Sequence, residues 1–110
     1  MQLVSGTPVY GVDVGPSTRC AHYHTDRDVL AFKFDCCERY YPCFRCHDAV
    51  TDHDAEPWPR HRFTEPSVLC GACGTKLTAP DYLECDYRCP SCEAPFNPGC
   101  GAHLDRYVEQ

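Results

Sequence analysis

Cysteine and histidine pairs at short, regular spacing are the residues of this chain that could do chemistry. A C-x-x-C loop points two sulfurs at one tetrahedral ion, about 2.3 Å from each, and structural zinc sites often use this spacing. The spacing occurs three times, and a C-x-H pair precedes it: Cys20/His22, Cys43/Cys46, Cys70/Cys73 and Cys89/Cys92. The pattern predicts a metal-binding protein.

The cysteine count favours metal ligation over a disulfide framework. The chain has 11 cysteines, and an odd number cannot all pair within one chain. Its beginning lacks the basic leader and apolar segment of a signal peptide, so we expect a reducing compartment in which thiols stay available for metal. No apolar stretch reaches the roughly 20 residues of a membrane helix. We therefore expect a soluble, cytoplasmic protein that does not contact a membrane.

The elements that must position these pairs are short. Residues 28–34 are rich in β-branched and aromatic side chains, and Leu30, Phe32 and Phe34 alternate around Lys33, which predicts a strand with one buried face. It ends at Cys36-Cys37. Residues 43–53 begin as a zinc knuckle and continue into a helical turn. Thr78 opens a sequence that resembles a capping box and predicts one or two helical turns after it.

The remaining segments offer few regular elements. Glycines and prolines break residues 1–17, which we interpret as a lead-in, and residues 54–67 form an irregular connection. Trp58 in that connection is either a packing anchor or an exposed recognition aromatic. A short terminal helix is expected over 102–108. Ordering costs on the order of 1.5 kcal/mol per residue, and apolar residues are scattered, so metal must supplement the hydrophobic core.

Several motifs agree with a known family in order and spacing. They are TRCAHY (18–23), FDCC (34–37), RYYPCFRCH (39–47), VLCGAC (68–73), LTAPDYLEC (77–85) and CPSCEAPFNPGCGAH (89–103). Together they resemble the CHY-type zinc finger, and we place that domain at residues 18–107. The resemblance implies a small, metal-dominated, irregular α+β fold. In it, zinc knuckles, short β-strands and one or two short helices are organised around three structural zinc ions.

The resemblance also implies the ligands, because that family binds its three zinc ions through twelve cysteines and histidines. Carried over by position, they are Cys20, His22, Cys36, Cys37, Cys43, Cys46, His47, His53, Cys70, Cys73, Cys89 and Cys92. Twelve ligands fill three tetrahedral sites with no open position. Closed sites of this kind are structural.

How the ligands pair into sites follows less directly. We expect one site to hold the four residues Cys20, His22, Cys43 and Cys46. Neighbours in an extended segment point to opposite sides, so Cys36 and Cys37 should serve different ions. The pairs 70/73 and 89/92 would then anchor the other two sites. Each of these sites would take one of Cys36 and Cys37 and one of His47 and His53.

Five further cysteines and histidines are left over. They are His24, His61, Cys85, Cys100 and His103. Cys100 and His103 have knuckle spacing, so a fourth zinc ion that uses them with Cys85 is one alternative. A reversible Cys85–Cys100 disulfide is another. The simplest interpretation makes Cys85 a small core residue and places His24 and His61 outside the ligand sets.

The charge of the chain bears on its partner. Sixteen acidic residues against ten Lys and Arg give a formal net charge of −6. Nine zinc-bound thiolates and three Zn²⁺ would make it about −9. Nucleic acid is therefore an unfavourable partner, since phosphates demand a basic face. We expect a protein partner, and the sequence specifies neither its identity nor an oligomeric state.

Two functions remain from these observations. The first is a non-enzymatic interaction module whose zinc ions hold a rigid surface. The second is a zinc- or thiol-handling assembly helper, similar to the helper of Tim proteins of this family, which would place the chain in the mitochondrial intermembrane space of a eukaryote. A RING ubiquitin ligase would need a further set of eight ligands, which this chain does not offer once the CHY ligands are assigned. A hydrolytic zinc enzyme is not indicated, because the sequence contains no HExxH motif.

Overall fold

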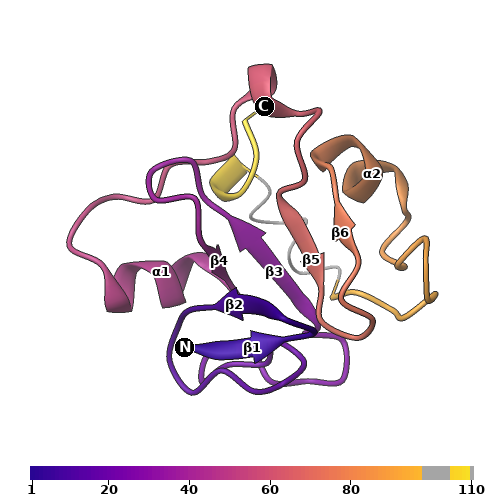
Figure 1. Cartoon of the computed structure of the whole chain (residues 1–110), viewed down its shortest axis with the longest axis horizontal. Coiled ribbons are helices and arrows are strands. Elements are labelled where there is room, and N and C mark those ends of the chain that lie inside the picture. Colours follow the sequence, from indigo (N-terminus) through magenta and orange to yellow (C-terminus); the bar gives the residue numbers. More distant parts are fainter. Residues whose placement is uncertain (98–104, 110) are drawn as a thin grey trace.

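The computed structural model describes residues 1–97 and 105–109. They form a small α+β fold with six short strands and two short helices (Figure 1). The strands are β1 (Gln2–Val4), β2 (Thr7–Val9), β3 (Leu30–Lys33), β4 (Tyr40–Tyr41), β5 (Val68–Cys70) and β6 (Lys76–Leu77). The helices are α1 (Phe44–Val50) and α2 (Ala79–Glu84), and a 3-10 helix spans Arg60–Arg62.

All six strands join one sheet in the order β1-β2-β4-β3-β5-β6. Neighbours are antiparallel except β2 and β4, which run parallel and meet at Val9 and Tyr40. Figure 1 shows α1 beside β4, in the middle of the sheet, and α2 beside β6, at one edge. No helix in the described part of the chain is long and apolar enough to cross a membrane.

The expectation that residues 1–17 contain no regular element is wrong. Strands β1 and β2 form a hairpin whose connection is Ser5-Gly6, with φ of 49° and 85°. Positive φ at both central residues is the condition for the two-residue turn that matches strand twist, and glycine meets it without strain. The glycine read as a breaker therefore makes the hairpin possible.

The predicted strand over 28–34 is present as β3, but both of its faces are buried. Phe32 packs in the main core, stacked on Tyr107 with ring centroids 3.9 Å apart. Ala31 points to the opposite face and is fully buried with Val9 and Leu69. The expectation of one buried face fails because the N-terminal hairpin covers the other one.

Local capping places the two helices where the sequence predicts them. The Cys43 sulfur accepts a hydrogen bond from the Cys46 amide at the start of α1. The Thr78 hydroxyl accepts one from the Asp81 amide, 3.3 Å away, at the start of α2. Such caps satisfy amides that have no partner within the helix. The zinc knuckle at residue 43 thus also begins a helix.

Trp58 is a packing anchor, as one of the two interpretations holds. Its side chain is fully buried, and its backbone pairs with the C-terminal segment. The Trp58 amide donates to the Tyr107 carbonyl and the Glu109 amide donates to the Trp58 carbonyl, each at 2.9 Å. Of the helix expected over 102–108, residues 102–104 lie outside the described residues, and 105–106 form a 3-10 turn.

Candidate metal centres

The twelve predicted ligands gather into three groups of four, and within each group all ligand atoms lie within 4.8 Å of one another. The first cluster is Cys20, His22, Cys43 and Cys46, the second is Cys36, Cys37, His47 and His53, and the third is Cys70, Cys73, Cys89 and Cys92. Each cluster joins segments that are apart in the sequence. All three are suited to zinc ions.

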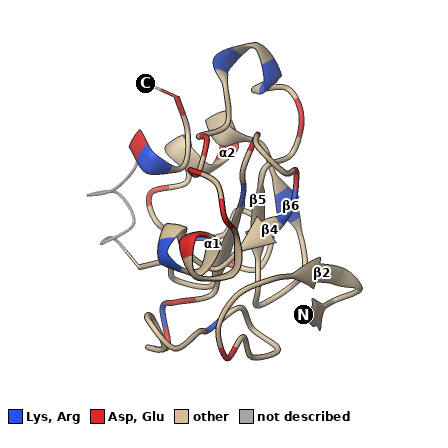
Figure 2. Cartoon of the chain, turned by 90° about the vertical axis from the view of Figure 1, so that its left-hand side faces the viewer, with Lys and Arg blue, Asp and Glu red and all other residues tan. Residues whose placement is uncertain are grey.

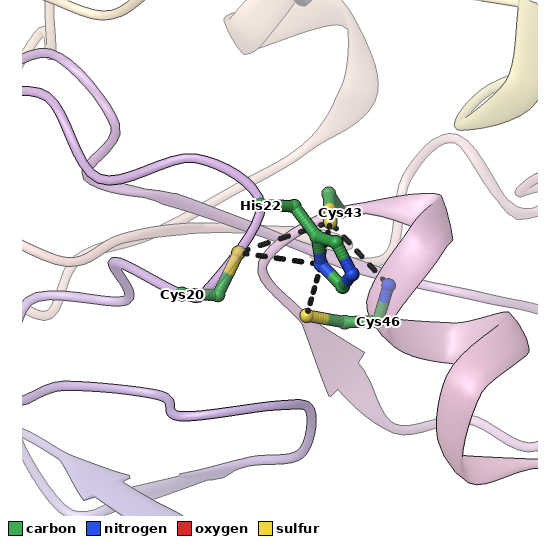
Figure 3. A group of neighbouring side chains, drawn as sticks. All are labelled: Cys20, His22, Cys43 and Cys46. Carbon is green, nitrogen blue, oxygen red and sulfur yellow. Dashed lines mark hydrogen bonds between the residues drawn. The ribbon is translucent and has the colours of Figure 1, made fainter.

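The first cluster has the composition expected from the sequence. The loop that follows the hairpin supplies Cys20 and His22, and the first turn of α1 together with its cap supplies the other two sulfurs. Figure 3 shows the His22 ring facing three sulfurs. Its Nδ1 lies 3.5 Å from the Cys46 sulfur and 3.6 Å from the Cys43 sulfur. The arrangement leaves one central position to which all four ligand atoms point.

The second cluster corrects the expected pairing. Cys36 and Cys37 lie in the same cluster, with their sulfurs 3.8 Å apart. The expectation that they serve different ions is therefore wrong. Nε2 of His47 lies 3.2 Å from the Cys36 sulfur and 3.2 Å from Nε2 of His53. The pairing rule for extended segments fails because these cysteines lie in a turn.

The third cluster contains four sulfurs and no histidine, which is the other half of that correction. Cys70 ends β5 and Cys73 follows in the next turn. The second C-x-x-C loop lies after α2. Sulfurs of the two loops are 3.8 Å apart in the Cys70–Cys92 pair and 3.7 Å apart in the Cys73–Cys89 pair. Cys73 and Cys92 are exposed and their two partners are buried.

The spacings within the clusters fit a tetrahedral zinc ion. Sulfurs bound at about 2.3 Å and nitrogens at about 2.05 Å have tetrahedral edges of roughly 3.8 Å between two sulfurs, 3.5 Å between sulfur and nitrogen, and 3.3 Å between two nitrogens. The sulfur pairs named above lie at 3.7–3.8 Å, and the three sulfur contacts of His22 lie at 3.5–3.9 Å. The contact of Cys36 with His47 is shorter, at 3.2 Å. The donor set, thiolate and imidazole, is the one zinc prefers in closed sites.

Hydrogen bonds around the clusters orient the ligands. Asp48 Oδ1 lies 3.3 Å from Nδ1 of His47, so that nitrogen can donate its proton while Nε2 faces the cluster. Carboxylate–histidine–zinc arrangements fix the imidazole in this way. The Val12 amide donates to the Cys46 sulfur at 3.5 Å, and the Cys92 amide donates to the Cys89 sulfur at 3.5 Å. Amide donors of this kind stabilise thiolate charge.

Crowding and burial oppose ionisation of all the thiols in one cluster. The hydrogen-bond contact with Cys20 raises the pKa of Cys43, and the same kind of contact raises the pKa of Cys46 to about 11. Hydrogen bonds from Cys43 and Cys46 in turn lower the pKa of Cys20. Burial raises the pKa of Cys70 in the third cluster and of Cys36 in the second. A divalent cation supplies the charge that lets every thiol ionise, and its binding releases protons.

The leftover cysteines and histidines that the structure describes, His24, His61 and Cys85, are outside these clusters. Cys85 is half-buried, and its thiol donates to the Tyr82 carbonyl at 3.0 Å, in agreement with a packing role. His24 and His61 are exposed. Cys100 and His103 lie outside the described residues, so the fourth zinc site and the Cys85–Cys100 disulfide remain predictions.

One residue that contacts both sides of the cysteine pair of the second cluster was not expected from the sequence. Arg62 donates hydrogen bonds to Asp35 and Glu38, on either side of the Cys36-Cys37 pair. The local sequence carries no signal of these contacts, because Arg62 is more than 20 positions away along the chain.

Comparison with known proteins gives consistent matches. A sequence model described as CHY zinc finger matches residues 20–107. An uncharacterised protein of Schizosaccharomyces pombe is 44% identical over 96% of this chain and 92% of its own length. Helper of Tim protein 13 of Saccharomyces cerevisiae is 36% identical over 94% of the chain and 91% of its own length. The Kluyveromyces lactis protein of the same name is 38% identical over 90% of this chain and 86% of its own length.

Proposed function

This chain belongs to the CHY zinc finger family, and we propose on that premise that it is a non-enzymatic, zinc-stabilised module that presents a rigid surface to a protein partner. One observation carries the proposal: each cluster brings together four protein ligand atoms. Catalytic zinc keeps three protein ligands and an open position for water. Four ligands leave no such position, so the role proposed for the metal is structural.

The twelve clustered cysteines and histidines are the proposed ligands, and residues 18–107 are the proposed zinc domain. Each ion would cross-link distant segments: the loop at 20–22 with α1, the turn at 36–37 with residues 47 and 53, and β5 with the loop after α2. Zinc binding in finger peptides contributes apparent free energies of roughly 10–16 kcal/mol. Three such links would make folding cooperative with metal binding.

A protein partner fits the charge better than nucleic acid does. The net charge is −6 before any thiolate is counted, and acidic positions recur in the loops around α1 and α2 on the face shown in Figure 2. Two relatives are named helpers of Tim proteins, which supports a protein as the partner. We propose the cytoplasm as the location, or the mitochondrial intermembrane space in a eukaryotic source.

A second candidate function is handling of zinc or thiols. Cys73 and Cys92 are exposed in the all-sulfur cluster, where a partner or an oxidant could reach them. Hydrogen peroxide could accept two electrons from two of these thiolates, which would form one disulfide while the peroxide, with two protons from solvent, becomes two water molecules. The ion would then lose two of its ligands and leave. This candidate also draws on the names of the two helper relatives.

Metal analysis before and after chelation tests the primary proposal. Elemental analysis of the purified protein should find three zinc ions per chain, one for each cluster. Exhaustive EDTA treatment should remove them and abolish the native circular dichroism spectrum. An unchanged spectrum after confirmed zinc loss would contradict a structural role for the metal.

Mild peroxide treatment separates the two candidates. A structural module keeps its zinc and its count of free thiols. A handling protein forms a disulfide and releases zinc in proportion, and a reductant restores both. Retention of zinc with unreactive thiols under conditions that oxidise a free C-x-x-C peptide would exclude the handling function.

A further inference from the structure

We propose that Arg62 is a positioning residue for the second cluster, because it clamps the turn that carries Cys36 and Cys37. The inference rests on the proposed zinc ligation. It adds a residue that binds no metal itself and determines how well one of the three sites is preformed.

The clamp consists of two short charge-assisted hydrogen bonds from one guanidinium. Nη1 of Arg62 donates to Oδ1 of Asp35 and Nη2 donates to Oε1 of Glu38, each at 2.7 Å. Asp35 and Glu38 are the residues immediately before and after the cysteine pair. A guanidinium holds its donors in a rigid planar fork. The two ends of the turn are therefore held at a fixed separation.

The guanidinium is itself held in place by the core. It stacks on the ring of Trp58, with its central carbon 4.1 Å from the ring centroid. The Trp58 indole N–H donates to the Arg62 carbonyl at 2.7 Å, and the Glu65 carboxylate accepts from Nε and Nη2. Since Trp58 is fully buried and Arg62 is only 20% exposed, the clamp is anchored to packed structure.

The turn needs such an anchor because the regular elements do not fix it. Cys36 and Cys37 lie after the end of β3 and are half-buried. Glu38 has a left-handed backbone with φ of 54°, a conformation that costs free energy for a residue with a side chain. Its amide bonds the Phe34 carbonyl at 2.8 Å. Holding both flanking carboxylates keeps the two sulfurs in ligand geometry, which raises affinity by preorganisation.

Cadmium-113 NMR with chelator competition tests the inference site by site. The three clusters have two, three and four thiolates, and the cadmium resonance moves downfield as thiolates replace nitrogens, so each site has its own signal. In Arg62→Gln, the two-thiolate signal should disappear at an EDTA concentration about 10-fold lower than in the wild type, the lower end of the usual cost of losing an outer-shell contact. The other two signals should titrate as in the wild type.

Two further variants make the result decisive. Arg60→Gln removes the same charge from the same 3-10 helix, where Arg60 is exposed, and should titrate as the wild type. Glu38→Gln removes one arm of the clamp at a carboxylate that is 57% exposed, and should weaken the two-thiolate signal selectively. If Arg62→Gln does not fold, the Glu38→Gln variant tests the clamp in its place.

The outcomes distinguish this inference from the proposed function. Equal titration of the two-thiolate signal in Arg62→Gln and Arg60→Gln would overturn the clamp, and so would a parallel weakening of all three signals. If Arg62→Gln does not fold, the clamp would be overturned by a Glu38→Gln variant in which the two-thiolate signal is not weakened selectively. A wild-type spectrum without a two-thiolate signal would instead overturn the zinc assignment itself.

Discussion

The sulfurs of Cys36 and Cys37 lie 3.8 Å apart, although the two residues are adjacent in the sequence. They are close because residues 34–38 form a tight turn closed by the bond from the Glu38 amide to the Phe34 carbonyl. In such a turn, consecutive side chains are not forced to opposite sides as they are in a strand. The pair can therefore chelate one ion.

The two C-x-x-C loops of the third cluster close in the same way. The Gly74 amide bonds the Cys70 carbonyl, and the Glu93 amide bonds the Cys89 carbonyl, each at 2.8 Å. Gly74 and Glu93 have positive φ, as Glu38 does, and each of the three follows a cluster cysteine. A common backbone turn thus presents cysteines in two different sequence patterns.

Zinc counts of double variants should reveal which ligands share an ion. Cys36→Ser/Cys37→Ser damages one cluster and should lose one of the three ions, whereas Cys37→Ser/Cys73→Ser damages two clusters and should lose two. Native mass spectrometry measures the count directly. Loss of two ions from the adjacent-cysteine variant would restore the pairing in which Cys36 and Cys37 serve different sites.

The N-terminal hairpin should contribute to stability through Val9. This side chain is fully buried, so Val9→Ala should lower the free energy of unfolding by about 2 kcal/mol while the zinc count stays unchanged. Leu3→Ala on the same hairpin is the matched control, because Leu3 is 56% exposed. Urea denaturation of the zinc-loaded protein measures both. Equal effects of the two variants would show that the hairpin is not anchored by its buried face.

Gly71 should not tolerate a side chain. A Cβ at this position would lie 2.3 Å from the Ser17 carbonyl oxygen, so Gly71→Ala must displace backbone and should cost about 1–3 kcal/mol. At Gly15 the nearest atom, the Arg19 carbonyl oxygen, is 3.8 Å away, and Gly15→Ala should stay within about 0.5 kcal/mol of the wild type. Thermal unfolding compares the two variants. A stable Gly71→Ala protein would show that residues 17 and 71 do not make this close approach.

Alkaline pH should destabilise the fold through Tyr40. Burial raises the pKa of Tyr40 from 10.0 to about 12. Because the folded pKa is the higher one, the unfolded chain loses this proton first, and stability is lost as pH rises from 10 towards 12. The loss due to this group should be about 1.4 kcal/mol at pH 11. Denaturation at pH 9 and pH 11 should show a smaller loss in Tyr40→Phe than in the wild type, and identical losses would exclude this origin.

The sequence predicted those parts of the fold that depend on local chemistry. The cap at Thr78 and the knuckle at Cys43 placed both helices, and alternation over 28–34 placed β3. It failed for the hairpin, because the glycines and prolines of residues 1–17 predict breaks, whereas Gly6 forms the hairpin turn together with Ser5. A breaker and a hairpin turn use the same residue types, and only the strand pairing, of β1 with β2 and of β2 with β4, distinguishes them here.

The residue types and spacings by themselves predicted four ligand pairs, because short-range chelate spacing is a local property of the chain. They are Cys20/His22, Cys43/Cys46, Cys70/Cys73 and Cys89/Cys92. The other four ligands and the number of ions came from the resemblance to the CHY-type zinc finger. Only the tertiary structure decided how those side chains are shared among three clusters and that Arg62 reaches Asp35 and Glu38. The reason is physical: these contacts depend on the handedness of a turn and on packing between distant segments, and neither leaves a periodic signal in the sequence.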